Sequence, residues 1–185
     1  MMNSKRESPW YERLKMLGRR TREDSNEIIS QGTFARELLR HLSSKPAKDF
    51  DAARRGAKLA DDPENPVFRR YFVAEQDEVV ARILTNLFSA QRETWPEEWD
   101  DPERSILSKT TGFMGTMWAL KNLVGFGQRQ RDLSKSLFLK IFRNSRARLE
   151  RERLSLMGRD FPSSAQGIRR LRDFFIAGVQ VAERG

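Results

Sequence analysis

Apolar residues recur along this chain at helical spacing, and this periodicity is the feature that most constrains its fold. The clearest case is the segment 75–92, where six apolar side chains fall every three to four positions and cover one wide face. They are Val79, Val80, Ile83, Leu84, Leu87 and Phe88. We find no convincing alternation of the kind that half-buried strands show. The sequence therefore predicts a mainly α-helical fold, a single helical bundle.

Length and composition narrow the class of protein. A chain of 185 residues fits one domain, and we predict a basic arm over residues 1–24 followed by a single helical domain over 25–185. The absence of cysteine excludes disulfides, zinc–thiolate sites and a cysteine nucleophile. No apolar run approaches the ~18 residues that span a bilayer, and the N-terminus lacks the apolar core of a signal peptide. We expect a cytoplasmic protein with no membrane partner, no metal and no cofactor.

The net charge of +9 is unevenly distributed. Residues 1–22 carry a net charge of +5, residues 23–120 carry −5, and residues 121–185 carry +9. Basic ends attract polyanions, so DNA is the expected partner, with RNA left open. The alternative is an ordinary arginine-rich surface, since arginine both binds phosphate and decorates solvated helices.

Short helices are expected in the first part of the chain. We predict an amphipathic turn or helix over 10–17, a helix capped by Ser25 that includes Ile28 and Ile29, and a helix that begins at Thr33 and ends near Ser43. The segment 45–66 has few large apolar side chains and is expected to be a loop with a short helix at about 50–60. Residues 67–73 fit either a strand or the start of a helix.

Proline, glycine and capping residues divide the second part of the chain. Pro96 ends the 75–92 helix at the latest, and Asp101 before Pro102 is predicted to start a short helix. A further helix is expected to begin at Thr110 or Thr111 and to break at Gly125 and Gly127. Residues 128–157 fit one long helix, and Ser163 with Gln166 forms a capping box for the last one.

Two groups of polar residues are candidate sites of chemistry. His41 is the only histidine, and the sequence names neither a nucleophile nor an orienting partner for it, which favours a structural role. An acidic cluster between residues 93 and 103 offers hard oxygen ligands, but its spacing is not that of a calcium loop. We interpret it as a helix cap and a solvated turn.

The turn Lys109–Gly112 stands at the start of a predicted helix. Free N–H groups at such a start bind anions, and the Lys and Thr side chains add donors. The residue order is not that of a P-loop, and the alternative is a cap with close packing at Gly112.

Arginines concentrate in the C-terminal helices over 128–185, where they fan around the polar surface and favour contact with the phosphate backbone over base readout. The alternative is solvated arginines paired with Glu150 and Glu152. The predicted nucleic-acid-binding residues of the whole chain are Arg19, Arg20, Arg22, Lys109, Thr110, Thr111, Arg143, Arg146, Arg148, Arg151, Arg169, Arg170 and Arg172.

The segment Trp95–Phe113 resembles the C-terminal helical region of DGQHR-domain proteins. The similarity lies in the Pro-Glu-Glu-Trp step at 96–99, the Asp-Pro step at 101–102, and Ile-Leu at 106–107 leading to Lys-Thr-Thr-Gly at 109–112. Weaker similarity extends over about 28–124. The family includes DndB-like regulators of DNA phosphorothioate modification, so the resemblance implies a role in bacterial DNA modification, regulation or defence.

One departure limits what this resemblance implies. The Asp-Gly-Gln-His-Arg motif that names the family is absent, and His41 lies between Arg40 and Leu42. No activity attached to that motif is carried over. We expect a truncated or split relative, or a coding region that starts late.

Three hypotheses follow from the sequence. The first is a non-enzymatic nucleic-acid-associated protein that binds the phosphate backbone through its basic ends. The second is a protein-interaction subunit, whose C-terminal helices dock a partner or a second copy through their apolar faces. The third, with least support, is an enzyme that acts on nucleotides or nucleic acid through the Lys109–Gly112 turn.

Overall fold

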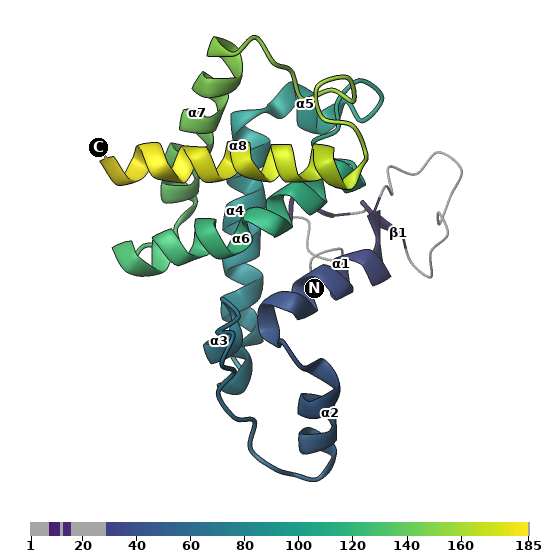
Figure 1. The fold of residues 1–185 in the computed structure, drawn as a ribbon, viewed down its shortest axis with the longest axis vertical. Helices are drawn as coiled ribbons and strands as arrows, with labels where there is room; N and C mark the ends of the chain where they lie inside the picture. The colour runs from purple at the N-terminus through teal and green to yellow at the C-terminus, as the bar shows by residue number, and fades with distance from the viewer. Residues whose placement is uncertain (1–7, 12, 16–28, 185) are drawn as a thin grey trace.

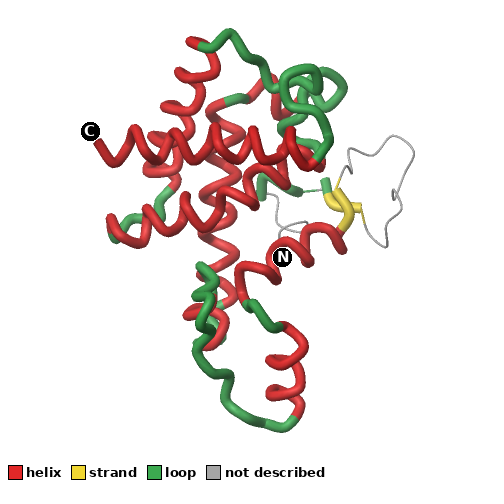
Figure 2. Tube along the Cα trace, in the orientation of Figure 1, coloured by secondary structure: helices red, strands yellow, loops and turns green. Residues whose placement is uncertain are grey.

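The computed structural model describes residues 8–11, 13–15 and 29–184, and this part of the chain is mainly helical, which confirms the predicted fold class (Figure 1). The helices are α1 Gln31–Leu42, α2 Pro46–Arg54, α3 Arg69–Val73, α4 Asp77–Thr94, α5 Pro96–Asp100, α6 Thr110–Gln130, α7 Lys135–Arg151 and α8 Ala165–Arg184. Figure 2 shows how little of the described chain is extended. Two strands of two residues, β1 Leu14–Lys15 and β2 Ile29–Ser30, pair in parallel with Leu14 opposite Ile29.

Helices α4, α6, α7 and α8 form the bundle. Helix α8 packs against both α6 and α7, and α4 packs against α7 (Figure 1). The apolar faces of the last two helices lie inside this core, where they are removed from water. Their most deeply buried side chains are Phe138, Ile141, Phe142, Leu171 and Phe175.

Two glycines allow α8 to approach its neighbours closely. A Cβ at Gly115 of α6 would lie 2.7 Å from the Leu171 side chain of α8. A Cβ at Gly178 of α8 would collide with the Ile141 carbonyl and the Ser145 hydroxyl of α7. The missing side chains therefore set the spacing of both helix pairs.

An aromatic cluster joins the N-terminal segment to the bundle. The Trp10 ring meets Trp99, Phe88 and Phe113 edge-on, at centroid distances of 5.0, 5.1 and 5.6 Å. Phe88 of α4 and Phe113 of α6 are stacked at 6.0 Å. Trp95 lies in the bundle core, against Phe142 and Phe175. These contacts place both tryptophans of the Trp95–Phe113 segment inside the protein.

Arg69 holds α1, α2 and α3 together. It is 5% exposed, and its guanidinium donates to both Asp49 carboxylate oxygens, at 2.5 and 3.0 Å, and to the Ala60 carbonyl. A longer bond of 3.5 Å reaches the Leu42 carbonyl. Hydrogen bonds from Arg69 hold the pKa of Asp49 below its usual value.

Several boundaries in the first part of the chain differ from those expected. Of the two alternatives for residues 10–17, the turn agrees with Trp10 and Tyr11, and the helix is wrong because residues 14–15 form a strand; residues 12, 16 and 17 lie outside the described residues. Ile29 also lies in a strand, where it and Leu14 become buried. Ser25 and Ile28 lie outside the described residues. Helix α1 is capped by the Ser30 hydroxyl, which accepts from the Thr33 N–H at 3.0 Å.

The loop over 45–66 does contain a short helix, but α2 begins earlier than expected, with Pro46 in its first turn. Residues 69–73 of the ambiguous segment are helical. Asp101 accepts the N–H groups of Glu103 and Arg104, each at 3.1 Å, yet the chain turns there and forms no helix.

The long helix predicted over 128–157 is wrong. Helix α6 continues through Gly125 and Gly127 to Gln130, and Gly127 gives the Asp132 carbonyl room to approach. Arg131 then adopts a left-handed conformation with φ of 54°, and the Ser134 hydroxyl caps α7. The last helix is capped by Ser164, whose hydroxyl accepts from the Gly167 N–H at 3.2 Å. The sequence predicted Ser163 as this cap, so the prediction is wrong by one residue.

Gly178→Ala is expected to destabilise the protein by about 1–3 kcal/mol, because the new methyl group overpacks the contact between α8 and α7. Gly125→Ala is the matched control, since its nearest neighbour is the Arg129 guanidinium at 3.7 Å. This control should stabilise the helix by up to about 1 kcal/mol. Urea unfolding of both variants measures the difference, and equal effects would contradict the packing account.

Candidate nucleic-acid interface

The predicted nucleic-acid-binding residues that the structure describes lie in two groups. Arg19, Arg20 and Arg22 of the N-terminal arm lie outside the described residues. The arginines of α7 form the first group. The second group lies where α6 and α8 begin, because Leu171 of α8 packs on Gly115 of α6 and the Ile106 N–H donates to the Leu156 carbonyl at 2.8 Å.

Helix α7 presents cations on its outward face. Arg143 and Arg151 are exposed, and no ion pair links either of them to a described carboxylate. Lys140, which the sequence analysis did not single out, shares this face. The three cations fall within an arc of about 80° on the helix. The sequence marks this stripe of three cations by their helical spacing, because Arg143 follows Lys140 by three residues and Arg151 follows it by eleven.

The other two arginines of α7 make contacts within the protein. Arg146 donates to the Thr94 carbonyl at 2.7 Å and to Glu150 at 3.0 Å. Arg148 pairs with Glu152 at 2.7 Å and lies 4.7 Å from the Phe174 ring centroid. These side chains bind the last turns of α7 to α4 and α8. We therefore leave them out of the proposed binding face.

The three arginines of α8 that the sequence predicted to bind nucleic acid are likewise of two kinds. Arg169 is exposed and forms no ion pair with a described residue. Arg170 donates to the Asp160 carbonyl at 3.0 Å and lies over the Phe161 ring, whereas Arg172 pairs with Asp173 at 2.7 Å. Only Arg169 of the three is unengaged within the described structure.

The Lys109–Gly112 turn is mainly a packing feature. The Gly112 N–H donates to the Ile106 carbonyl at 3.0 Å, and a Cβ at Gly112 would collide with the Leu107 carbonyl. Thr111 is 6% exposed. Thr110 is exposed, and the Lys109 ammonium lies 3.4 Å from the Glu103 carbonyl. Lys109 and Thr110 thus remain at the surface, while Thr111 lies beneath it.

Ion pairs engage much of the acidic cluster. Asp100 binds Arg13 at 2.7 Å and Arg92 at 3.2 Å, and Glu93 binds Lys135 at 2.5 Å. Within the described residues, no group of three or more His, Cys, Asp or Glu side chains is placed to hold a metal ion. No helix in the same part of the chain is both long and apolar enough to cross a bilayer.

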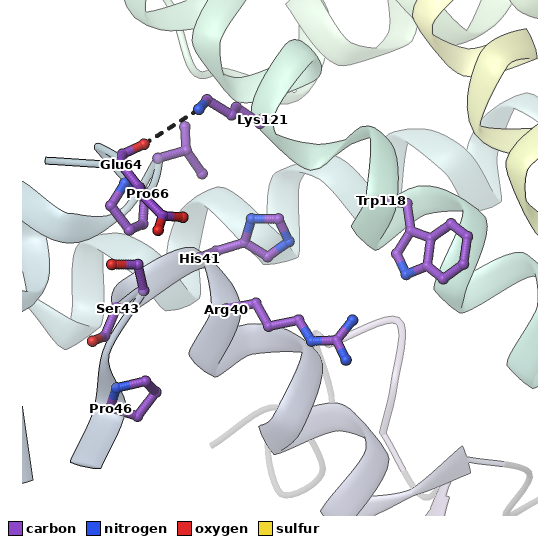
Figure 3. Close-up of a pocket in the computed structure, with 10 residues that line it drawn as sticks. Arg40, His41, Ser43, Pro46, Glu64, Pro66, Trp118 and Lys121 are labelled. Atoms are coloured by element: carbon purple, nitrogen blue, oxygen red, sulfur yellow. Dashed lines mark hydrogen bonds between the residues drawn. The ribbon is translucent and has the colours of Figure 1, made fainter. Parts of the chain in front are cut away.

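A cavity of about 480 Å³ opens between the end of α1 and the middle of α6 (Figure 3). Its polar lining includes Arg40 and His41 from α1, Trp118 and Lys121 from α6, and Glu64 from the loop before α3. The cavity could not be predicted from the sequence, because its walls come from segments up to 81 residues apart. The sequence signal in α6 is the helical spacing of Trp118 and Lys121, which are three residues apart.

His41 is uncharged in the folded protein at neutral pH. Burial is the main cause and lowers its pKa from 6.5 to about 4, while the nearby Arg40 and Lys121 also disfavour the charged form. A hydrogen bond to the Met117 carbonyl acts in the opposite direction. The imidazole thus serves as a neutral wall of the cavity that ties α1 to α6.

Comparison with known proteins gives no independent assignment: the chain matches no protein-family model, no curated protein and no solved structure.

The low pKa of His41 predicts a specific loss of stability in mild acid. The unfolded chain takes up this proton near pH 6.5 and the folded protein only near pH 4, so stability is fully present above pH 6.5 and falls as the pH drops toward 4. Between pH 7 and 4.5 we expect His41 to account for about 2 kcal/mol of lost stability. Denaturant unfolding of the wild type and His41→Gln measures this difference.

The carboxylates of Asp49, Asp62 and Asp160 have pKa values below the usual 3.8, so their contribution is lost at lower pH than this window. His41 is also the only histidine, so its NMR titration can be read directly. Equal pH dependence in both proteins, or a titration midpoint near 6.5 in the folded state, would contradict the assignment.

Proposed function

We propose that this protein is a non-enzymatic nucleic-acid-associated protein that binds the phosphate backbone through its basic surfaces. The observation that carries the proposal is the outward face of α7, where Lys140, Arg143 and Arg151 are exposed without a described ion-pair partner. Cations that are not neutralised within the protein are free to replace the counterions of a polyanion, which is the main source of sequence-independent affinity.

The arrangement favours backbone contact over base readout. The three side chains lie on one exposed helical face, and the apolar face of α7 is packed in the bundle core. Base readout needs side chains that enter a groove and meet base edges, whereas phosphate contact needs only accessible charge. Arg169 and Thr110, which are exposed, and the half-buried Lys109 offer a second polar region at the end of the bundle.

A place in bacterial DNA modification, regulation or defence rests on the resemblance of Trp95–Phe113 to DGQHR-domain proteins, and it remains a proposal from sequence. The alternative of a protein-interaction subunit required free apolar faces on the C-terminal helices. Those faces form the core, and the one large apolar side chain of α8 that is exposed in the described structure is Val181, at 53% exposure. The described structure therefore favours nucleic acid over protein docking by these helices.

Replacing Arg143 and Arg151 together by Gln is expected to weaken DNA binding. Each lost phosphate contact removes about 0.9 from the slope of log K against log salt, so the double variant should reduce the slope by up to about 2. Gel-shift titrations over a salt series, with two unrelated duplexes and a single strand, measure affinity and slope. The wild type should bind at low salt with little sequence preference.

The matched control is Arg55→Gln with Lys58→Gln, which removes the same charge from exposed positions just after the end of α2, away from α7 (Figure 1). If both double variants bind equally weakly, net charge and not the α7 face carries the affinity. Failure of the wild type to bind any of these DNAs at low salt would rule out the proposed function.

A further inference from the structure

A second cavity, of about 440 Å³, lies along the C-terminal half of α6, and its opposite wall is the segment that leads into α3. Two hydrogen bonds from α6 hold this wall in place. The Lys121 ammonium donates to the Glu64 carbonyl at 3.4 Å (Figure 3), and the Gln128 amide donates to the Val67 carbonyl at 3.1 Å. The segment 64–67 therefore runs beside α6 for about two turns, and the space between them is an open groove.

This groove, which we call the α6 groove, is lined by three cations: Arg70 from α3, and Lys121 and Arg129 from α6. The amides of Asn65 and Gln128 also line it, and the lining that the structure describes includes no acidic residue. Helix α6 itself contains no Asp or Glu, and neither does the whole stretch 104–131. An anion in the groove therefore meets positive and neutral side chains.

Neutral groups hold two of the three cations. The Arg70 guanidinium donates to the Tyr71 hydroxyl and lies 4.5 Å from the centroid of that ring, which orients its charge without neutralising it. The 3.4 Å bond of Lys121 is long for a charge-assisted one, usually about 2.7–2.9 Å. Arg129 is paired with Glu183 at 2.5 Å, but both side chains are exposed, and such surface pairs contribute little stability. A phosphate can therefore compete for all three cations.

Gly125 lines the groove halfway between Lys121 and Arg129. A Cβ at this position would meet only the Arg129 guanidinium, at 3.7 Å, so no packing contact requires a glycine here. At Gly127, by contrast, a Cβ would collide with the Asp132 carbonyl. A glycine inside a helix costs about 0.5–1 kcal/mol relative to alanine, and one use of it is to let a ligand approach the backbone closely. The missing side chain leaves that room in the α6 groove.

We propose that the α6 groove binds the phosphodiester backbone of a single nucleic-acid strand, which passes over Gly125. Lys121 and Arg129 lie about 12 Å apart along the helix, so they meet different phosphates of one strand. A positively charged groove that tracks the backbone is the usual means of binding single strands without sequence preference. The inference rests on the proposed function and extends it to a second surface, which shares no residue with the α7 face.

Fluorescence anisotropy with a labelled oligothymidylate tests the groove, and a duplex of equal length is titrated in parallel. Arg70→Gln with Lys121→Gln removes two exposed cations that no described carboxylate neutralises. Each lost phosphate contact with a single strand removes about 0.7 from the slope of log K against log salt, so the strand slope should fall by about 1.4. Strand affinity at low salt should fall by about fivefold or more, and duplex affinity by no more than about twofold.

The control for this charge change is again Arg55→Gln with Lys58→Gln, which should leave strand affinity within about twofold of the wild type. Gly125→Leu fills the groove without changing the charge. It should weaken strand binding about fivefold, while the thermal melt stays equal or rises, because leucine favours a helix over glycine. Its matched control is Gly158→Leu, at an exposed position where a Cβ meets nothing within 4 Å.

Unchanged strand affinity in either groove variant, or a loss no larger than in its control, would overturn the proposal. Equal losses for strand and duplex would overturn the assignment to a single strand. Polyglutamate that displaces the strand as well as an unlabelled strand does, at equal concentration of charge, would point to an acidic protein and overturn it too. A wild type that binds neither DNA fails the proposed function itself, whereas duplex binding with strand affinity unaffected by the groove variants fails this inference alone.

Discussion

The close approach of α8 to α6 and α7, at Gly115 and Gly178, is the constraint on which the rest of the bundle depends. It fixes which face of each neighbour is turned inward. Because Ile141 and Ser145 of α7 lie beneath Gly178, the opposite face of α7, with Lys140 and Arg143, is left to solvent. The same reasoning applies to α6, where the side turned toward Leu171 is buried and the side that carries Trp118 and Lys121 borders the cavity. Packing thus separates the basic face of α7 from the cavity.

The segment Trp95–Phe113 contributes to this core more than to a site. Trp95 fills the contact between α4, α7 and α8, and Trp99 meets Trp10 in the aromatic cluster. Rings of this size supply much of the apolar area that a small bundle buries. Resemblance of another sequence to this segment therefore indicates similar packing of the core. It says less about function, because the exposed cations lie on helical faces outside the segment.

The sequence was a good guide where local chemistry decides the structure. The apolar stripe of Val79 to Phe88 located α4, since one buried face is enough to define a helix. It failed where tertiary contacts decide. Gly127 looked like a breaker, but it lets the chain turn back against α6. The cavity was not foreseen, because its lining residues Arg40 and Lys121 belong to helices that meet only after folding. Of the predicted arginines, the sequence could not separate Arg146, which binds the Thr94 carbonyl, from Arg143, which is free of described ion pairs.

The distribution of charge on α7 itself supports binding of an anion. Lys140 and Arg143 are three positions apart, so they repel each other on an exposed helical face, at a cost of about 0.2–0.5 kcal/mol. Elsewhere on the same helix, Arg146 and Arg148 are each followed four residues later by a glutamate that pairs with them. The helix therefore neutralises its cations where they secure α4 and α8, and leaves them unneutralised where they face solvent. Bound phosphate relieves this repulsion, so the stripe is most stable when a polyanion lies along it.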